Sequence, residues 1–335
     1  MADTEQALIH SFLDENFAGD TLTQLDTFTQ SRGIDDFGRT PIADTEQPPI
    51  YTFLDENFAG DTFTQLLGIN DFNEIAGYHN QAVNQGFTLT LPNTFTTENF
   101  PNSTSTQVVG IENQGETTGF YVDHAGTTHG FINEDNRFES VDAPNTAFTQ
   151  LLGINNHEEE AGYSSVDPAG MVNQRAFVHN ENDGSFSYLT LPTNVNSQAT
   201  SINDHHDVVG FFMPTATTSD GFLLKDGHLT TLQFPGSTFT QAFGVNNEDD
   251  IVGAYQDANG NTHGFSYDDG HYTTLDVPGA TMTVINGINN FDNVVGFFVD
   301  AAGNTEGVVG APLQSLSQND TTHFHHDTHT DHALT

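Results

Sequence analysis

Short runs in which apolar and polar residues alternate, separated by turns rich in Asn, Asp and Gly, fill most of this chain. The stretch from Gly244 shows the pattern clearly and reads GVNNEDDIVGAYQDANGNTHGFSYDDGHYTTLDVPG. Alternation with a period of two is typical of β-strands, and no long stretch has the spacing of an amphipathic helix. Each unit of this kind therefore predicts four short antiparallel strands. In this copy the second to fourth strands cover residues 251–255, 263–267 and 271–277.

The unit is repeated along the chain. The branched residue of a Gly-Ile-Asn-like step recurs at Ile69, Ile111, Ile154, Ile202, Val245 and Ile288. The spacings are 42, 43, 48, 43 and 43 residues, and a glycine follows each copy eight positions later. Four strands in about 43 residues is the size of a β-propeller blade. The sequence thus predicts an all-β fold, a β-propeller of four-stranded antiparallel blades, with six blades favoured and seven as the alternative.

The last repeat lacks its fourth strand, because nothing after Gly307 resembles the YTTLDVPG segment that ends the preceding unit. Residues 53–60, FLDENFAG, align with that segment and run directly into the first full repeat. An N-terminal strand that completes the last blade would pair two otherwise open sheet edges. We therefore expect residues 53–60 to close the ring.

The same eight residues also occur at positions 12–19, and ADTEQ occurs at both 2–6 and 43–47. Residues 1–46 are therefore interpreted as an N-terminal arm, or as a degenerate blade, that carries a spare closing strand. The propeller is expected over 47–312 and an acidic, His-rich tail over 313–335. A spare strand can pair with the sheet edge of a neighbouring chain, which predicts a homo-oligomer or filament. The assembly strand residues are Phe12, Leu13, Phe17, Phe53, Leu54 and Phe58.

Composition adds a strong electrostatic constraint. The chain has 46 acidic but only 5 basic residues, a formal charge of −41, and no cysteine. Such a charge repels nucleic acid, anionic lipid and phosphorylated ligands, and it attracts divalent cations. No apolar run approaches the roughly 20 residues that span a bilayer, so membrane insertion is not expected. The 28 Phe, beside 8 Tyr and no Trp, predict a core built largely from Phe.

The third strand of the repeat carries a further motif. It reads His129-Gly130-Phe131 and His263-Gly264-Phe265, with altered forms at Arg175-Ala176-Phe177 and Asp220-Gly221-Phe222. Together with the GINN and VVG(Y/F) steps, this pattern resembles the HAF family of probable extracellular repeats, over roughly residues 63–310. The resemblance implies a bacterial protein that is extracellular or at the cell surface, with no known chemistry. The N-terminal residues show no conventional signal peptide, which departs from that expectation.

Two groups of residues are candidate metal ligands. The tail holds imidazoles and carboxylates that suit a transition metal such as Zn²⁺, at His323, His325, His326, His329, His332, Asp327 and Asp331. The turn with Asp257, Asn259 and Asn261 has the D-x-N-x-N spacing of part of a calcium loop. Both also have structural explanations, since a polar tail can simply be solvated and tight turns favour Asn and Asp. No cofactor is required, and calcium or a transition metal is the candidate.

Other functions find less support in the sequence. Thr and Asn on outer strands could bind glycans, but Tyr78, Tyr121, Tyr163 and Tyr255 adjoin the repeat glycine, where core packing is favoured. There is no nucleophile elbow, P-loop or zinc-protease motif, so no enzyme is predicted, and a hydrolase built on a carboxylate pair stays an open alternative. The leading hypothesis is an extracellular, self-assembling propeller whose subunits join through a terminal strand. The alternative is a binding module for divalent metal ions or glycans.

Overall fold

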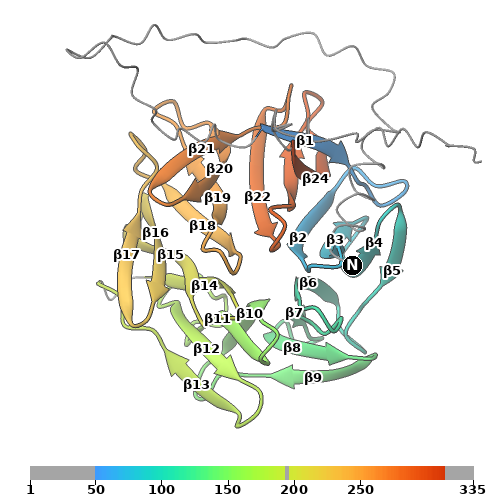
Figure 1. The fold of residues 1–335 in the computed structure, drawn as a ribbon. Helices are drawn as coiled ribbons and strands as arrows, with labels where there is room; N and C mark the ends of the chain where they lie inside the picture. The colour runs from blue at the N-terminus through green and yellow to red at the C-terminus, as the bar shows by residue number, and fades with distance from the viewer. Residues whose placement is uncertain (1–49, 193–195, 314–335) are drawn as a thin grey trace, which may run out of the picture.

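The computed structural model describes residues 50–192 and 196–313, which form a ring of six four-stranded antiparallel sheets (Figure 1). The predicted six-bladed β-propeller is therefore confirmed. In this part of the chain no helix is present that is long and apolar enough to cross a membrane. The predicted arm (1–46) and the tail beyond Leu313 lie outside the described residues.

Each blade runs from an inner strand at the axis to an outer strand at the rim. The inner strands are β2 (Thr64–Ile69), β6 (Ser105–Ile111), β10 (Phe148–Ile154), β14 (Ser197–Ile202), β18 (Thr240–Val245) and β22 (Met282–Ile288). The second strands are β3 (Glu74–Asn80), β7 (Thr117–Val122), β11 (Glu159–Ser165), β15 (Val208–Thr215), β19 (Ile251–Gln256) and β23 (Val294–Val299). The third strands are β4 (Asn84–Thr90), β8 (Thr128–Glu134), β12 (Arg175–Asn180), β16 (Thr218–Lys225), β20 (Thr262–Asp268) and β24 (Thr305–Leu313). The outer strands are β5 (Thr94–Thr97), β9 (Arg137–Val141), β13 (Ser185–Tyr188), β17 (His228–Leu232), β21 (His271–Leu275) and β1 (Ile50–Asp55).

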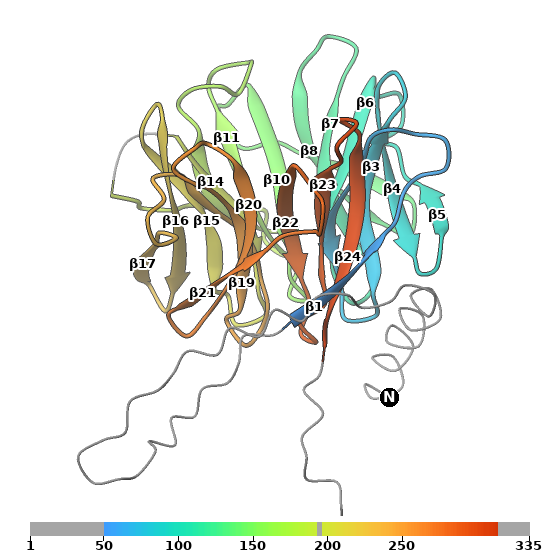
Figure 2. The same ribbon diagram turned by 90° about the horizontal axis from the view of Figure 1, so that it is seen from above.

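Blades I to V each use four consecutive strands, whereas blade VI combines β22, β23 and β24 with β1. Figure 2 shows β1 lying along β24, and the register runs from Ile50 opposite Leu313 to Asp55 opposite Val308. Closure by an N-terminal strand was expected, but over residues 53–60. The strand instead ends at Asp55. Glu56 still donates its N–H in register to the carbonyl oxygen of Gly307 at 2.9 Å, but the N–H of Gly307 donates to the side chain of Asn57 at 2.9 Å, and the chain turns toward blade I there.

Phe supplies the centre of most blades, as the composition predicted. The third-strand Phe is fully buried in five blades, at Phe87, Phe131, Phe177, Phe222 and Phe265. The residue before it must be small: a Cβ built on Gly130 would lie 2.8 Å from the carbonyl oxygen of Val141 and 3.0 Å from Leu151. The His before that faces outward, and His129 contacts Asp142 at 2.9 Å while His263 contacts Asp276 at 2.7 Å. The His-Gly-Phe step is thus a packing motif of the third strand.

Inner strands approach one another closely at the axis. A Cβ on Gly68 of blade I would lie 2.5 Å from the carbonyl oxygen of Val109 in blade II, and one on Gly153 would lie 2.8 Å from Ser201 in blade IV. Since real Cβ atoms do not approach backbone so closely, glycine at this position in five of the blades allows the strands to converge, and blade IV has the small residue Ser201 there. This convergence brings the ends of all six inner strands together at one mouth of the channel.

Candidate functional site

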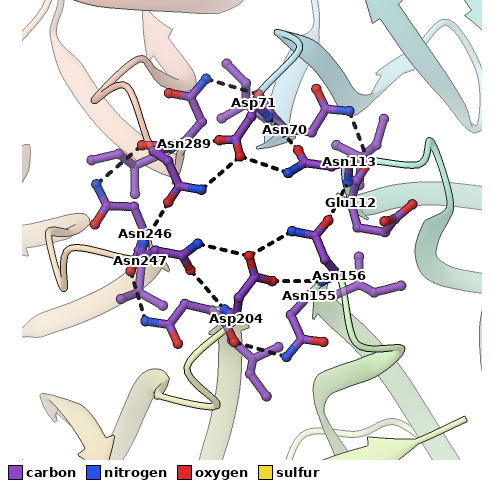
Figure 3. A pocket seen from close by; sticks show the side chains of 18 residues that line it. Asn70, Asp71, Glu112, Asn113, Asn155, Asn156, Asp204, Asn246, Asn247 and Asn289 are labelled. Carbon is purple, nitrogen blue, oxygen red and sulfur yellow. Dashed lines mark hydrogen bonds between the residues drawn. The ribbon is translucent and has the colours of Figure 1, made fainter. Parts of the chain in front are cut away.

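A double ring of polar side chains surrounds the axis where the inner strands end (Figure 3). Each blade contributes the two residues that follow its branched Ile or Val. These pairs are Asn70 and Asp71, Glu112 and Asn113, Asn155 and Asn156, Asn203 and Asp204, Asn246 and Asn247, and Asn289 and Asn290. Together with the branched residues they line a cavity of about 70 Å³. That volume is room for several water molecules or a hydrated ion.

The first residue of each pair forms the outer ring and is buried. Its side-chain oxygen caps its own turn: Oδ1 of Asn70, for example, accepts the N–H groups of Phe72 and Glu74 at 3.0 and 2.9 Å. Its amide nitrogen then donates to the main-chain carbonyl of the equivalent residue in the next blade, as Asn155 does to Asn203 at 3.0 Å. Asn289 closes the circle by donating to the carbonyl of Asn70 at 3.0 Å. The outer ring therefore ties neighbouring blades together.

Glu112 is the exception in the outer ring. Its carboxylate caps its own turn, through the N–H groups of Gln114 and Glu116 at 2.7 and 2.9 Å. It has no amide hydrogen, however, so it cannot make the link to Asn155 that the other blades make to their neighbours. Blade II thus has Glu where the other blades have Asn, so one interblade donor is lost and a carboxyl group lies beside the cavity.

The second residue of each pair forms the inner ring. Six main-chain N–H groups each donate to the side-chain Oδ1 of the next blade at 2.8 to 3.0 Å, without a break in the circle. Four amide groups also donate to the two carboxylates. Asn113 and Asn290 flank Asp71 at 2.8 Å, and Asn156 and Asn247 flank Asp204 at 2.8 and 2.9 Å.

The two Asp residues belong to blades I and IV, which are opposite in a ring of six, and their carboxylates face each other across the cavity (Figure 3). Burial alone would raise the pKa of Asp204. The hydrogen bonds from Asn247 and Asn156 outweigh it and lower the pKa below its ordinary value. This carboxylate is therefore ionised at neutral pH.

The Lys and Arg side chains of the described part of the chain do not offset this charge, although the charge of His157 makes a smaller contribution that also lowers the pKa of Asp204. Arg137 bonds Glu134 at 2.5 Å, Arg175 lies over the ring of Tyr188, and Lys225 contacts two acids between blades IV and V. The axial mouth thus carries Asp71, Asp204 and the nearby Glu112 around one small polar cavity.

The sequence placed its candidate calcium ligands elsewhere, in the turn between β19 and β20. There Oδ1 of Asp257 accepts the main-chain N–H groups of Asn259 and Asn261, both at 2.8 Å. Oδ2 of Asp257 accepts the two amide groups of the same residues. These bonds, first among them the main-chain bond from Asn261, hold the pKa of Asp257 below its ordinary value. Both oxygens of Asp257 are thus engaged by groups of the same turn, and calcium binding there stays a prediction.

The remaining candidates fall partly outside the structure. Phe53 and Leu54 lie in β1, and Phe58 packs against the core of blade I. Phe12, Leu13 and Phe17 lie outside the described residues, as do the tail candidates His323, His325, His326, His329, His332, Asp327 and Asp331. Over residues 50–192 and 196–313, no group of three or more His, Asp or Glu side chains could hold a metal ion. The axial ring was not predicted from the sequence. The sequence does carry its signal, because a polar pair ends each Gly-Ile-Asn-like step.

Comparison with known proteins places the chain by fold only. No protein-family model and no curated protein sequence matches it. Among solved structures, a putative TolB from Agrobacterium tumefaciens superposes with a TM-score of 0.53 at 9% identity, covering 80% of this chain and 92% of that one. TolB from Acinetobacter baumannii gives a TM-score of 0.46 at 9% identity and covers 79% of this chain and 55% of that one. Such low identity shows a shared β-propeller fold and nothing finer, so the resemblance to HAF repeats stays a prediction.

Proposed function

We propose that this propeller is a binding module, without a catalytic role, that holds a hard divalent cation at the axial mouth. The observation that carries the proposal is the pair formed by Asp71 and Asp204, which face each other across a polar cavity. Partly buried carboxylates are normally paired with a basic group or with a metal ion. In the described residues no Lys or Arg side chain faces this pair, and His157 is the basic group whose charge acts on Asp204. The charge of −41 over the whole chain draws cations toward it.

The donor set favours a calcium- or magnesium-type ion. Every side chain of the two rings offers oxygen and none offers sulfur or imidazole, and oxygen is what these ions prefer. The rings leave room for water, so an ion can keep part of its hydration shell between the carboxylates. Binding would join blades I and IV across the axis and so stabilise the closed ring.

The test is calorimetric titration of the full chain with CaCl₂ and with MgCl₂ in about 0.15 M NaCl, which screens diffuse attraction to the surface. We expect one site per chain and a matching rise in melting temperature. The double variant Asp71→Asn/Asp204→Asn should lose both effects, because it removes the facing charges and keeps the size of the side chains.

The matched control is Asp226→Asn/Asp269→Asn, which changes the net charge equally. Both positions are exposed turn residues with positive φ, a conformation that suits Asn at least as well as Asp. This variant should bind like the unaltered protein. Equal heats from the axial variant and the unaltered protein would refute a cation at the axis.

Self-association is a second candidate function, and the closing strand favours it. Residues 53–60 begin in β1 and residues 12–19 have the same sequence, so each chain carries a second copy of a segment that pairs with β24. We propose that the spare copy displaces β1 on another chain, which links subunits by strand exchange. We also propose that the protein is extracellular or at the cell surface, and this location is supported by the resemblance to HAF repeats.

Light scattering of the full chain and of a chain lacking residues 1–41 tests strand exchange. The full chain should form concentration-dependent oligomers and the shortened chain should be a monomer. Substituting Leu13→Lys in the full chain should reduce association, because a charge would then replace the copy of Leu54 in the pairing strand. Monomers in every case would remove the proposal.

A further inference from the structure

One blade lacks a side chain that the other five share. The residue after the repeat glycine is aromatic in blades I to IV and in blade VI, at Tyr78, Phe120, Tyr163, Phe211 and Phe297. In blade V the same position, after Gly253, is Ala254. The missing ring makes blade V different at a place where the repeat is otherwise regular.

Blades I and III show what the ring does. Tyr78 lies against Phe63, with ring centroids 5.7 Å apart, and its hydroxyl donates to Oε1 of Gln65 at 2.8 Å. Tyr163 lies against Phe148 in the same way, with ring centroids 5.5 Å apart. Both Tyr side chains are buried. The ring therefore fills a socket between inner strands that has an aromatic wall and, in blade I, a hydrogen-bond acceptor.

Blade V keeps this socket and leaves out the ring. Gln241 pairs with Ala254 across the ladder as Gln65 pairs with Tyr78, and Phe239 precedes it as Phe63 precedes Gln65. The aromatic wall and the acceptor are both present, but neither has the partner that it has in blade I.

A cavity of about 300 Å³ lies at this place, between blades V and VI. Its walls include Phe239, Gln241, Phe243, Tyr255, Met282 and Phe297. The volume suits a small molecule, since ligand sites begin at about 300 Å³ and an apolar cavity of about half that size can hold benzene. The walls are largely aromatic and aliphatic, with amide groups at a few positions.

We infer that the Ala254 cavity is a binding site for a small ligand with a hydroxylated aromatic ring, a phenol, which takes the place of the missing Tyr side chain. The ring would lie against Phe239 and its hydroxyl would donate to Gln241. A sugar ring fits this wall less well, because its hydroxyl groups need polar partners around the whole rim and most of the lining is apolar. The site shares no lining residue with the axial cavity and does not depend on the proposed cation.

The test is titration of the full chain with 4-methylphenol, the side chain of tyrosine as a free molecule, followed by calorimetry and by ligand-observed NMR. We expect one site per chain in the millimolar range or tighter. Toluene, which lacks the hydroxyl, should bind about fivefold more weakly, the loss of one neutral hydrogen bond. A pyranoside such as methyl glucoside should not compete, and preferential binding of the pyranoside would overturn the phenol assignment.

Two variants locate the site. Ala254→Tyr rebuilds the ring of the sister blades and should abolish 4-methylphenol binding while raising the melting temperature. Gln241→Leu should weaken 4-methylphenol to the level of toluene and leave toluene unchanged. Undiminished binding by both variants would place the ligand elsewhere, and no binding by the unaltered protein would refute the inference.

The repeat also offers a gain-of-function control that does not need Ala254→Tyr to fold. Tyr163→Ala should open an equivalent socket beside Phe148 in blade III and add a second site. Asp71→Asn/Asp204→Asn should leave phenol binding unchanged, so failure of the cation proposal and failure of this one can be told apart. A Tyr163→Ala protein with an unchanged number of sites would show that the missing ring does not create the pocket.

Discussion

The contacts between blades IV and V and between blades V and VI use the same positions of the repeat but carry different charges. We call the contact between two neighbouring blades a seam. In both of these seams, the acidic residue four positions after the outer-ring Asn of one blade faces an acidic residue of the next blade. That second residue lies three positions after the outer-ring Asn of its own blade. These acid pairs are Asp207 with Asp249, and Asp250 with Asp292. Lys225, at the end of β16, contacts both acids of the first seam, Asp207 at 3.4 Å. The equivalent residue in the second seam, at the end of β20, is Asp268.

The difference shows how this acidic chain keeps its blades together. In the seam between blades V and VI, burial and the charges of Asp292 and Asp268 raise the pKa of Asp250 to about 7, although a hydrogen bond from Asn246 offsets part of the effect. Burial, joined by Asp268, also raises the pKa of Asp292. In the other seam burial raises the pKa of Asp207, but the charge of Lys225 opposes it. Below about pH 7 one seam therefore holds a proton on Asp250, whereas the other has a lysine beside its two acids.

A third seam has amides at both positions in place of the two acids. Between blades VI and I the same two positions are Asn293 and Asn73, and Nδ2 of Asn293 donates to Oδ1 of Asn73 at 3.1 Å. Asn73 and Asp292 have the same φ, 59°, so the backbone accepts an amide or an acid equally well at this position. Neutral amides thus make the same contact without a dependence on pH.

The largest expected effect is the pH dependence of the unaltered protein. Burial raises the pKa of Glu56, Glu160 and Asp250 to about 7 and that of Glu116 to about 8. Because these values exceed those of the unfolded chain, the folded state holds more protons between pH 5 and 8, and stability falls as pH rises through that range. After a discount for partial exposure we expect a loss of about 4 kcal/mol from pH 5 to pH 8, measured by urea unfolding at constant ionic strength. Constant or rising stability would show that these four carboxyl groups do not hold protons in the folded state.

The second largest effect is expected when the two amides of the seam between blades VI and I are introduced into the seam between blades V and VI. Asp250→Asn/Asp292→Asn should stabilise the protein by about 2 kcal/mol at pH 8, because two carboxylates no longer repel each other between blades. The gain should shrink by more than half at pH 5, because Asp250 of the unaltered protein is protonated there. Urea unfolding at both pH values measures this, with Asp226→Asn/Asp269→Asn as the control for net charge. A gain of equal size at both pH values would mean that general charge reduction, and not the seam, is responsible.

The sequence predicted the blades well because they depend on local signals. Alternation, the turn residues and the six copies of the Ile or Val step fixed the strands and the number of units. The closing strand was also recognised from its likeness to the fourth strand of blade V. Its end was misplaced because the side-chain bond of Asn57 to Gly307 joins residues that lie 250 positions apart and has no local signature.

The axial ring and the seams were missed for the same physical reason. Asp71 and Asp204 look like ordinary turn residues in the sequence, and Asn and Asp are what such turns favour. Only closure of the ring places them opposite each other. Ala254 likewise looks like an ordinary small residue of a strand. That it leaves a cavity becomes evident only when it is compared with the five aromatic residues at the same position in the other blades. A comparison of the copies at each repeat position could have indicated both features.

The smallest expected effect is also the sharpest comparison of the two charged seams. Asp268→Lys gives the seam between blades V and VI the lysine that the neighbouring seam has, and it should stabilise the protein by about 0.5–1 kcal/mol at pH 8, since position 268 is exposed and surface ion pairs are weak. The converse variant, Lys225→Asp, should lower the melting temperature and make it fall more steeply between pH 5 and 8, because Asp207 is buried and would lose its only basic contact in the described structure. Thermal unfolding of both variants at pH 5 and 8 measures the pair. If the shift that each variant causes in the melting temperature is the same at pH 5 as at pH 8, a lysine cannot take the place of the bound proton in these seams. If the shifts are opposite in sign and larger at pH 8, a single residue at the end of the third strand decides how strongly each seam responds to pH.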